Sequence, residues 1–189
     1  MMMRWFVMGA ATLALLVSAP ACKRQPAQTM TTETAAGAAE MMSDDDKEFM
    51  TKAAQGSMLE VALGEQIANR ATDPDVRAFG QKMVTDHGRA HQELKELAAS
   101  RGLALPTQLK EEHQEEVTEM TKLSGPKLDQ EYADDMVEDH EKDVKEFREA
   151  VNEVKDPELR AWAQKTLPIL ESHLEQAKRI KAKVAPQED

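Results

Sequence analysis

The chain has a single cysteine, Cys22, in 189 residues. One cysteine excludes an intramolecular disulfide and the paired-cysteine spacing of structural zinc sites. Aromatic residues are also scarce, at 4%, and the abundance of Ala, Leu, Glu, Lys and Gln favours helices over sheets. Neither a glycine-rich phosphate loop nor a nucleophile elbow is present. The 31% charged and 41% hydrophobic residues are typical of one soluble globular domain, which excludes a disordered chain and a multi-span membrane protein.

The first 21 residues predict a secretory signal peptide. Arg4 is followed by the uncharged run Trp5–Val17 and by the small residues Ser18–Ala21, which is the order of charge, apolar core and cleavage site in such signals. The apolar run is shorter than the roughly 20 residues that a membrane-spanning helix needs. We therefore expect an exported protein from which residues 1–21 are removed.

Cys22 stands directly after this cleavage site. The segment Ala19–Cys22 resembles a bacterial lipoprotein box, with alanine where leucine is commonest and proline at the next position. The resemblance implies a lipid on Cys22 and a flexible tether over residues 22–43. Because Lys23 follows in place of aspartate, it also implies the periplasmic side of the outer membrane. Simple cleavage after Ala21 is the alternative, and it predicts a soluble periplasmic or secreted protein.

An excess of acidic residues limits the partners. Loss of Arg4 with the signal leaves 23 of the 24 basic residues against 35 acidic ones, a net charge of −12. Such a surface excludes binding to nucleic acid or to anionic lipid headgroups by charge. We therefore expect no nucleic-acid partner, and contact with the membrane only through the lipid on Cys22. Protein partners are undefined, and a homo-oligomer formed through an exposed apolar stripe stays open.

Four long amphipathic helices are predicted between residues 44 and 184. Each begins with local start chemistry, either an N-cap side chain or a proline in the first turn. Apolar residues then recur at helical spacing in each segment. Four such helices predict an all-α four-helix bundle, followed by a tail at 185–189. The start signals are Ser43 with its acidic run, Asp73-Pro74, Gly125-Pro126 and Asp156-Pro157.

The lengths of the connections predict the topology. Only a few residues around Asp73 and Asp156 separate the first helix from the second and the third from the fourth, so each pair should be an antiparallel hairpin. Gly102 ends the second helix. Residues 103–125 then form a long crossover that contains a short helix from about residue 107 to residue 122. One long connection between two hairpins is the ferritin-like topology.

An internal repeat supports this arrangement. Residues 74–82 (PDVRAFGQK) closely match residues 157–165 (PELRAWAQK), which makes the second and fourth helices equivalent and indicates a duplicated ancestry. A second echo, between residues 83–87 (MVTDH) and 136–140 (MVEDH), is too short to establish the order of the repeats.

One ionisable residue lies in the middle of each apolar stripe, and these are Glu60, His87, His140 and His173. An unpaired carboxylate or imidazole in a core costs on the order of several kcal/mol. Counted from the nearby turns at a rise of about 1.5 Å per residue, all four residues lie within one or two helical turns of a common depth. We therefore expect them to meet one another or a metal ion.

Two interpretations of this meeting point stay open. One carboxylate and three imidazoles suit one divalent ion such as zinc, copper or iron, with Asp139 and Asp143 as second-choice ligands. Alternatively, Glu60 accepts hydrogen bonds from the histidines in a buried polar network that fixes the register of the bundle. His91, at the edge of the second stripe, and His113, among crossover glutamates, are weaker candidates. No catalytic residue is identified.

Four short stretches carry a resemblance to a known family: Glu60–Gly64, Met83–His87, Met136–His140 and Leu167–Leu174. Through them the chain resembles uncharacterised, exported bacterial proteins with a ferritin-like bundle. That family is labelled a domain of unknown function or a predicted outer-membrane protein. The resemblance covers the chain from about Asp44 to Lys183 and implies a fold and an address, but no activity.

The pattern of a ferritin-like di-iron oxidase is incomplete. Such sites take a Glu-x-x-His from each of two helices, but Val84 stands three residues before His87 and Leu170 three residues before His173. The third helix offers His140 where a glutamate is needed. We therefore expect a non-enzymatic, lipid-anchored envelope interaction or stress-related protein, with a periplasmic metal-binding protein as the alternative.

Overall fold

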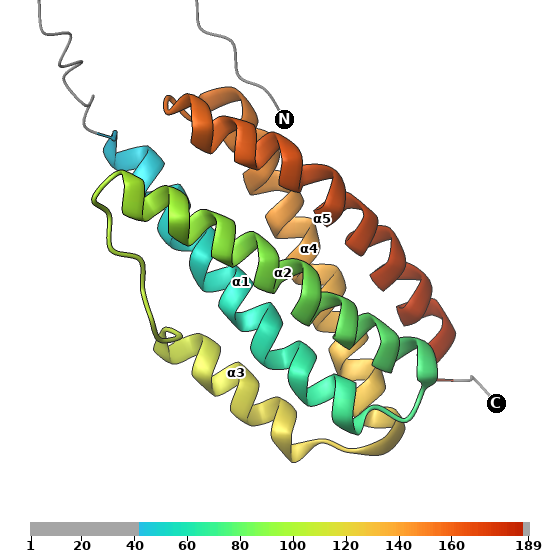
Figure 1. Ribbon diagram of the computed structural model, residues 1–189. Coiled ribbons are helices and arrows are strands. Elements are labelled where there is room, and N and C mark those ends of the chain that lie inside the picture. The colour runs from blue at the N-terminus through green and yellow to red at the C-terminus, as the bar shows by residue number, and fades with distance from the viewer. Residues whose placement is uncertain (1–41, 187–189) are drawn as a thin grey trace, which may run out of the picture. The chain divides into compact units, whose positions relative to one another are not determined.

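The computed structural model describes residues 42–186, so the predicted signal peptide, Cys22 and most of the predicted tether lie outside the described residues. Five helices account for most of residues 42–186, and no strand occurs among them. The predicted all-α bundle of two antiparallel hairpins and a long crossover is confirmed (Figure 1). The helices are α1 (Asp44–Arg70), α2 (Pro74–Ser100), α3 (Glu111–Lys122), α4 (Gly125–Glu153) and α5 (Pro157–Val184).

The bundle is held mainly by two helix pairs. α1 packs along α2, and α4 packs along α5, while α2 and α5 join the two pairs. The short helix α3 lies against α1 and α4 (Figure 1). Among the helices described, none combines the length and the apolar character needed to cross a bilayer.

The helix starts follow the capping chemistry of the sequence. The Ser43 side chain accepts a hydrogen bond from the Asp46 N–H at the start of α1. Asp73 and Asp156 cap α2 and α5 in the same way, each accepting from two backbone N–H groups, and a proline follows each of them. At the end of α2, Gly102 has a φ of 69°, a left-handed conformation that glycine adopts without steric cost. These boundaries agree with the prediction.

The start of α3 does not agree with the prediction. The sequence placed it at about residue 107, whereas α3 begins at Glu111. The Gln55 side chain on α1 donates to the Gln108 carbonyl and accepts from the Lys110 N–H, both at 2.9 Å. These two bonds hold residues 108–110 against α1 in a non-helical conformation. A tertiary contact therefore overrides the local helix preference, and the prediction was wrong by about one turn.

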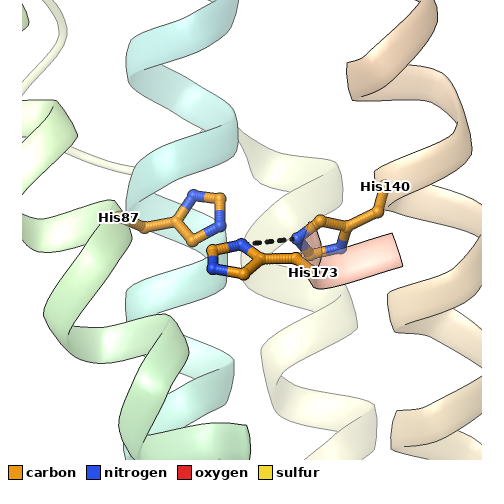
Figure 2. A group of neighbouring side chains, drawn as sticks. All are labelled: His87, His140 and His173. Atoms are coloured by element: carbon orange, nitrogen blue, oxygen red, sulfur yellow. Dashed lines mark hydrogen bonds between the residues drawn. The ribbon is translucent and has the colours of Figure 1, made fainter. Parts of the chain in front are cut away.

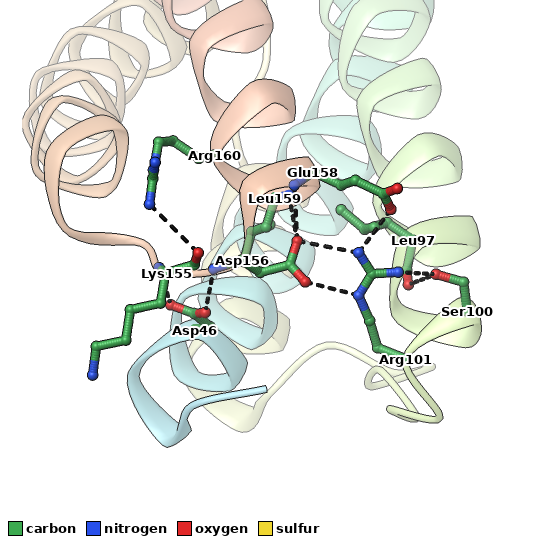
Figure 3. Close-up of polar contacts among 9 residues, drawn as sticks. All are labelled: Asp46, Leu97, Ser100, Arg101, Lys155, Asp156, Glu158, Leu159 and Arg160. Carbon is green, nitrogen blue, oxygen red and sulfur yellow. Dashed lines mark hydrogen bonds and ion pairs between the residues drawn. The ribbon is translucent and has the colours of Figure 1, made fainter. Parts of the chain in front are cut away.

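Two buried aspartates connect the hairpins to each other. Asp46 in the first turn of α1 accepts the N–H groups of Lys155 and Asp156, in the α4–α5 turn, at 3.1 and 2.9 Å (Figure 3). Asp129 near the start of α4 likewise accepts the N–H groups of Thr72 and Asp73, in the α1–α2 turn, at 3.0 and 2.7 Å. Each hairpin thus supplies a hydrogen-bond acceptor for the backbone N–H groups in the turn of the other hairpin.

These paired contacts reveal the spacing of the internal repeat. Asp46 and Asp129 are 83 positions apart, and so are Asp73 and Asp156. The arginines that follow obey the same spacing: Arg77 donates to the Ala71 carbonyl and Arg160 to the Val154 carbonyl. The hairpin, and not the single helix, is therefore the repeated unit. The three histidines do not obey this spacing, because their counterparts are Ser57, Ala90 and Leu170.

Two apolar clusters fill the bundle, one toward each end. The first contains Leu63, Phe79 and Met136, and the second contains Met50 and Leu94 among other residues. His87, His140 and His173 belong to neither cluster, although all are buried. A polar layer therefore separates two hydrophobic cores in the middle of the bundle.

Candidate metal centre

Three of the four predicted polar residues meet in this middle layer. His87 extends from α2, His140 from α4 and His173 from α5, and their rings form a triangle with centroid separations of 5.6, 5.4 and 5.3 Å (Figure 2). One ring nitrogen from each histidine lies within 4.8 Å of the other two. Among residues 42–186 this is the one group of three or more potential ligands that converges so closely.

Hydrogen bonds define the tautomers of two of the rings. His140 Nδ1 lies 2.9 Å from the Met136 carbonyl oxygen, which can only accept, so this nitrogen carries the proton and Nε2 carries a lone pair. His173 Nε2 lies 3.0 Å from Asp86 Oδ2, so it donates and leaves the lone pair on Nδ1. Each ring is therefore fixed by a partner outside the cluster.

These tautomers bring two lone pairs face to face. His140 Nε2 and His173 Nδ1 are 3.3 Å apart, and neither has a proton to share with the other. Burial, and then the neighbouring His173, lower the pKa of His140 to about 4, which disfavours an added proton between the two nitrogens at neutral pH. Two nitrogens bound to one tetrahedral ion at about 2.0–2.1 Å lie roughly 3.3 Å apart. The observed separation therefore matches that of two ligands of one metal ion.

The third ring completes a set of neutral imidazoles. His87 is 4% exposed, and within the described part of the chain its Nε2 has no hydrogen-bond partner. Burial, and then the nearby His140 and His173, lower its pKa well below the usual 6.5. Metal binding requires the neutral imidazole, and this environment supplies it without loss of a proton. The centroid of the Phe79 ring lies 6.4 Å from that of His140 and 6.2 Å from that of His173, so Phe79 covers the two rings on one side.

Asp86 orients the cluster and was missed by the sequence reasoning. Besides accepting from His173, Asp86 accepts from Lys82 Nζ at 2.5 Å. Burial raises the pKa of Asp86, but the bonds from Lys82 and His173 outweigh it and leave the pKa below its usual value. Asp86 is therefore a carboxylate at neutral pH. A carboxylate behind a histidine is the usual outer partner of a metal ligand, and its signal was the Asp-His pair at residues 86–87.

Glu60 lies beside the cluster and not within it. Its carboxyl is 3.5 Å from His140 Nδ1, the nitrogen that faces away from His173. Glu60 is 1% exposed, and neither oxygen has a hydrogen-bond partner among residues 42–186. Burial, and then Asp143 and Asp139, raise its pKa well above 4.5. Burial therefore favours the protonated form of Glu60, which lies behind His140 and outside the convergent nitrogens.

The second-choice ligands lie on the same side as Glu60. Asp139 and Asp143 are one turn apart on α4 and line a pocket between α1, α3 and α4 that also includes His113 and Glu60. Burial, and then Asp139 and Glu146, raise the pKa of Asp143 to about 7. His91 lies away from both places, in a pocket near the start of the crossover. None of these residues joins the three histidines.

A small cavity adjoins the histidines from inside the bundle. It measures about 20 Å³, enough for one water molecule. His87, His173, Phe147 and Trp162 are among the residues that line it. Its walls are mostly apolar. The remaining lining residues are Ala53, Gly56, Ser57, Asp86, Ala90, Asp143, Thr166, Ile169 and Leu170.

Comparisons with known proteins agree with the fold and leave the chemistry undefined. The sequence profile of a family described as "Domain of unknown function (DUF4142)" matches residues 31–180. Among curated proteins, none matches the chain. The crystal structure of a DUF305 fragment from Deinococcus radiodurans is similar, with a TM-score of 0.67 and 12% identity, over 75% of this chain and 98% of that one. At such low identity this likeness shows the bundle fold alone.

Proposed function

The chain belongs to the DUF4142 family, a domain of unknown function, and we propose that this member binds one divalent transition-metal ion through His87, His140 and His173. The observation that carries the proposal is the 3.3 Å contact between two unprotonated ring nitrogens. Lone pairs repel at this distance unless a cation lies between them. The outer partners that fix them, Met136 and Asp86, are of the kind that orient histidine ligands in metal sites.

The ligand set indicates which ions fit. Three imidazole nitrogens suit zinc, copper or iron, whereas magnesium and calcium prefer oxygen ligands. The di-iron arrangement is not supported, since Val84 and Leu170 occupy the positions of two bridging glutamates. Three protein ligands leave a further position for water, and the adjoining cavity has room for it. A single mononuclear ion is therefore the proposed occupant.

The alternative, a purely structural polar network, has less support. Such a network stabilises a core when every member has a partner. Within the part of the chain that the structure describes, both Glu60 oxygens and His87 Nε2 have none. Because these atoms are buried without partners, apolar side chains in this layer would give a more stable fold than the observed residues. This favours the interpretation that the residues serve binding.

The proposed setting is the bacterial envelope. The leader at residues 1–21 and the lipoprotein-like box before Cys22 support export and lipid attachment. In cells the parent should fractionate with membranes and carry acyl mass on Cys22, whereas Cys22→Ser should be released in soluble form. Equal membrane association of both would overturn the anchor and leave the metal proposal untouched.

Elemental analysis tests the metal proposal. The leaderless protein, residues 22–189 with Cys22→Ser to remove a competing thiol, is purified without chelators or affinity histidines and incubated with zinc, copper or iron. We expect one equivalent of metal in this protein, much less in His87→Leu, and one equivalent in His91→Leu, which removes a histidine outside the cluster. Equal metal content in all three would refute the assignment.

A further inference from the structure

The inner cavity and the outer pocket meet at two residues. Gly56 on α1 and Asp143 on α4 line both the cavity beside His87 and His173 and the pocket between α1, α3 and α4. The outer pocket reaches the surface at the exposed Lys52 and Lys142, beside the half-buried Glu146. The two spaces therefore adjoin at Gly56 and Asp143, between α1 and α4, which have few direct contacts with each other.

Gly56 keeps this place open. A Cβ built on Gly56 has only Asp143 Oδ1 within 4 Å, at 3.9 Å. Gly64, two turns later on α1, is different, because a Cβ there would lie 2.7 Å from the Gly80 carbonyl and would push α1 away from α2. A glycine inside a helix costs roughly 0.5–1 kcal/mol relative to alanine. Close packing explains Gly64 but not Gly56, whose effect is to leave space.

The outer pocket is suited to a cation. Glu60, Asp139 and His113 all line it, and each has a buried side-chain atom without a hydrogen-bond partner among residues 42–186: Glu60 Oε1 and Oε2, Asp139 Oδ2 and His113 Nδ1. Glu60 is itself almost fully buried. Lys110 and Lys142 also line the pocket, and Lys110 pairs with Glu112. Lys52 lines the pocket as well and pairs with Glu48. Because burial favours the protonated form of Glu60, attraction of a cation rests on Asp139, Asp143 and Glu146, and carboxylates in a concave space concentrate cations from solution.

We propose that the metal ion reaches the histidines through this pocket, passing between Gly56 and Asp143 into the inner cavity. The inference rests on the proposed metal-binding function. A hydrated divalent cation exchanges part of its water shell for the carboxylate oxygens of Asp139 and Asp143. It then moves past the open side of Gly56 and exchanges those oxygens for imidazole nitrogens, which borderline transition metals prefer. The same passage serves for release.

The binding rates of copper(II) or cobalt(II) test this route. Trp162 is the one tryptophan left in the leaderless protein and lines the inner cavity, so quenching of its fluorescence in a stopped-flow instrument reports arrival of the ion. Gly56→Leu should lower the association and dissociation rates together, by about tenfold or more, with the Kd within about twofold of the parent. Gly56→Ala, which fits the available space, should leave both rates within about twofold.

The charge of the passage gives a second test that does not depend on Gly56→Leu folding. Asp143→Asn should slow association and weaken its dependence on ionic strength. Asp134→Asn, the same change at an exposed position of α4, should leave the rate unchanged. Equal rates in Gly56→Leu and Gly56→Ala, or equal slowing by Asp143→Asn and Asp134→Asn, would overturn the route. Absence of binding by the parent, or full binding by His87→Leu, would instead overturn the metal site.

Discussion

Replacing His87 by leucine should have opposite effects on stability with and without metal. In the metal-free protein, His87 Nε2 is buried without a hydrogen-bond partner among the described residues. Leaving such a group unsatisfied costs about 1–3 kcal/mol, and leucine removes that cost with a side chain of similar volume. The metal-free variant should therefore be more stable than the parent by about 1–3 kcal/mol.

Metal reverses this order. An ion that binds only the folded state stabilises it by about 2.7 kcal/mol at 100 times its Kd and about 4.1 kcal/mol at 1,000 times. The parent should gain this amount, and the variant, which retains two of three ligands, should gain much less. At the higher concentration the parent should become the more stable protein, because its gain exceeds the advantage of leucine.

Urea unfolding of the leaderless protein, followed by circular dichroism, measures both comparisons. His91→Leu is the matched control, because it removes a histidine of the same helix that lies outside the cluster and should gain as much from metal as the parent. A metal-free His87→Leu that is less stable than the parent by about 1 kcal/mol or more would refute the reasoning. It would mean that the imidazole is satisfied in the core, so that the layer is a structural network.

Three further predictions follow from the contacts around the cluster. Asp86→Asn should weaken metal binding by about 10–100-fold, measured by competition with a chelating indicator, because the carboxylate that holds the proton on His173 Nε2 is lost. Glu60→Gln should stabilise the metal-free protein increasingly as the pH rises above about 4.5, measured by urea unfolding between pH 5 and 8. Burial raises the folded pKa of Glu60, so the unfolded state releases the proton first as the pH rises. The parent therefore loses stability between pH 5 and 8, whereas the glutamine variant does not. An equal gain in stability from the substitution at pH 5 and at pH 8 would contradict this. Asp129→Ala should destabilise the fold by about 2–5 kcal/mol, because the N–H groups of Thr72 and Asp73 lose their acceptor, and unchanged amide exchange at these two residues would argue against it.

The helix boundaries could be predicted where their cause is local. Asp73 and Asp156 act on N–H groups two or three residues later, so a short window of sequence contains both donor and acceptor. The start of α3 depends on Gln55, more than fifty residues earlier, and no local pattern contains that contact. The fold was thus predictable from the sequence, and the start of α3 was predicted to within about one helical turn.

The sequence predicted the level along the bundle at which the site residues lie, but not the direction in which each side chain faces. Counting the rise along each helix placed His87, His140 and His173 at one level, and they meet there. Which way a side chain faces depends on how the helices pack around one another, and this put Glu60 behind His140. Adjacent residues on a helix point about 100° apart. The Asp86 carboxylate therefore accepts a hydrogen bond from His173 on α5 and not from its neighbour His87.

The reciprocal contacts of Asp46 and Asp129 also bear on how the chain reaches its native state. Each hairpin lacks acceptors for its own turn until the opposite hairpin arrives, so neither half should persist as a separate folding intermediate. Cleavage in the crossover should accordingly yield two fragments that are unstructured apart and refold together as a heterodimer. The two hairpins of the internal repeat are in this way mutually dependent.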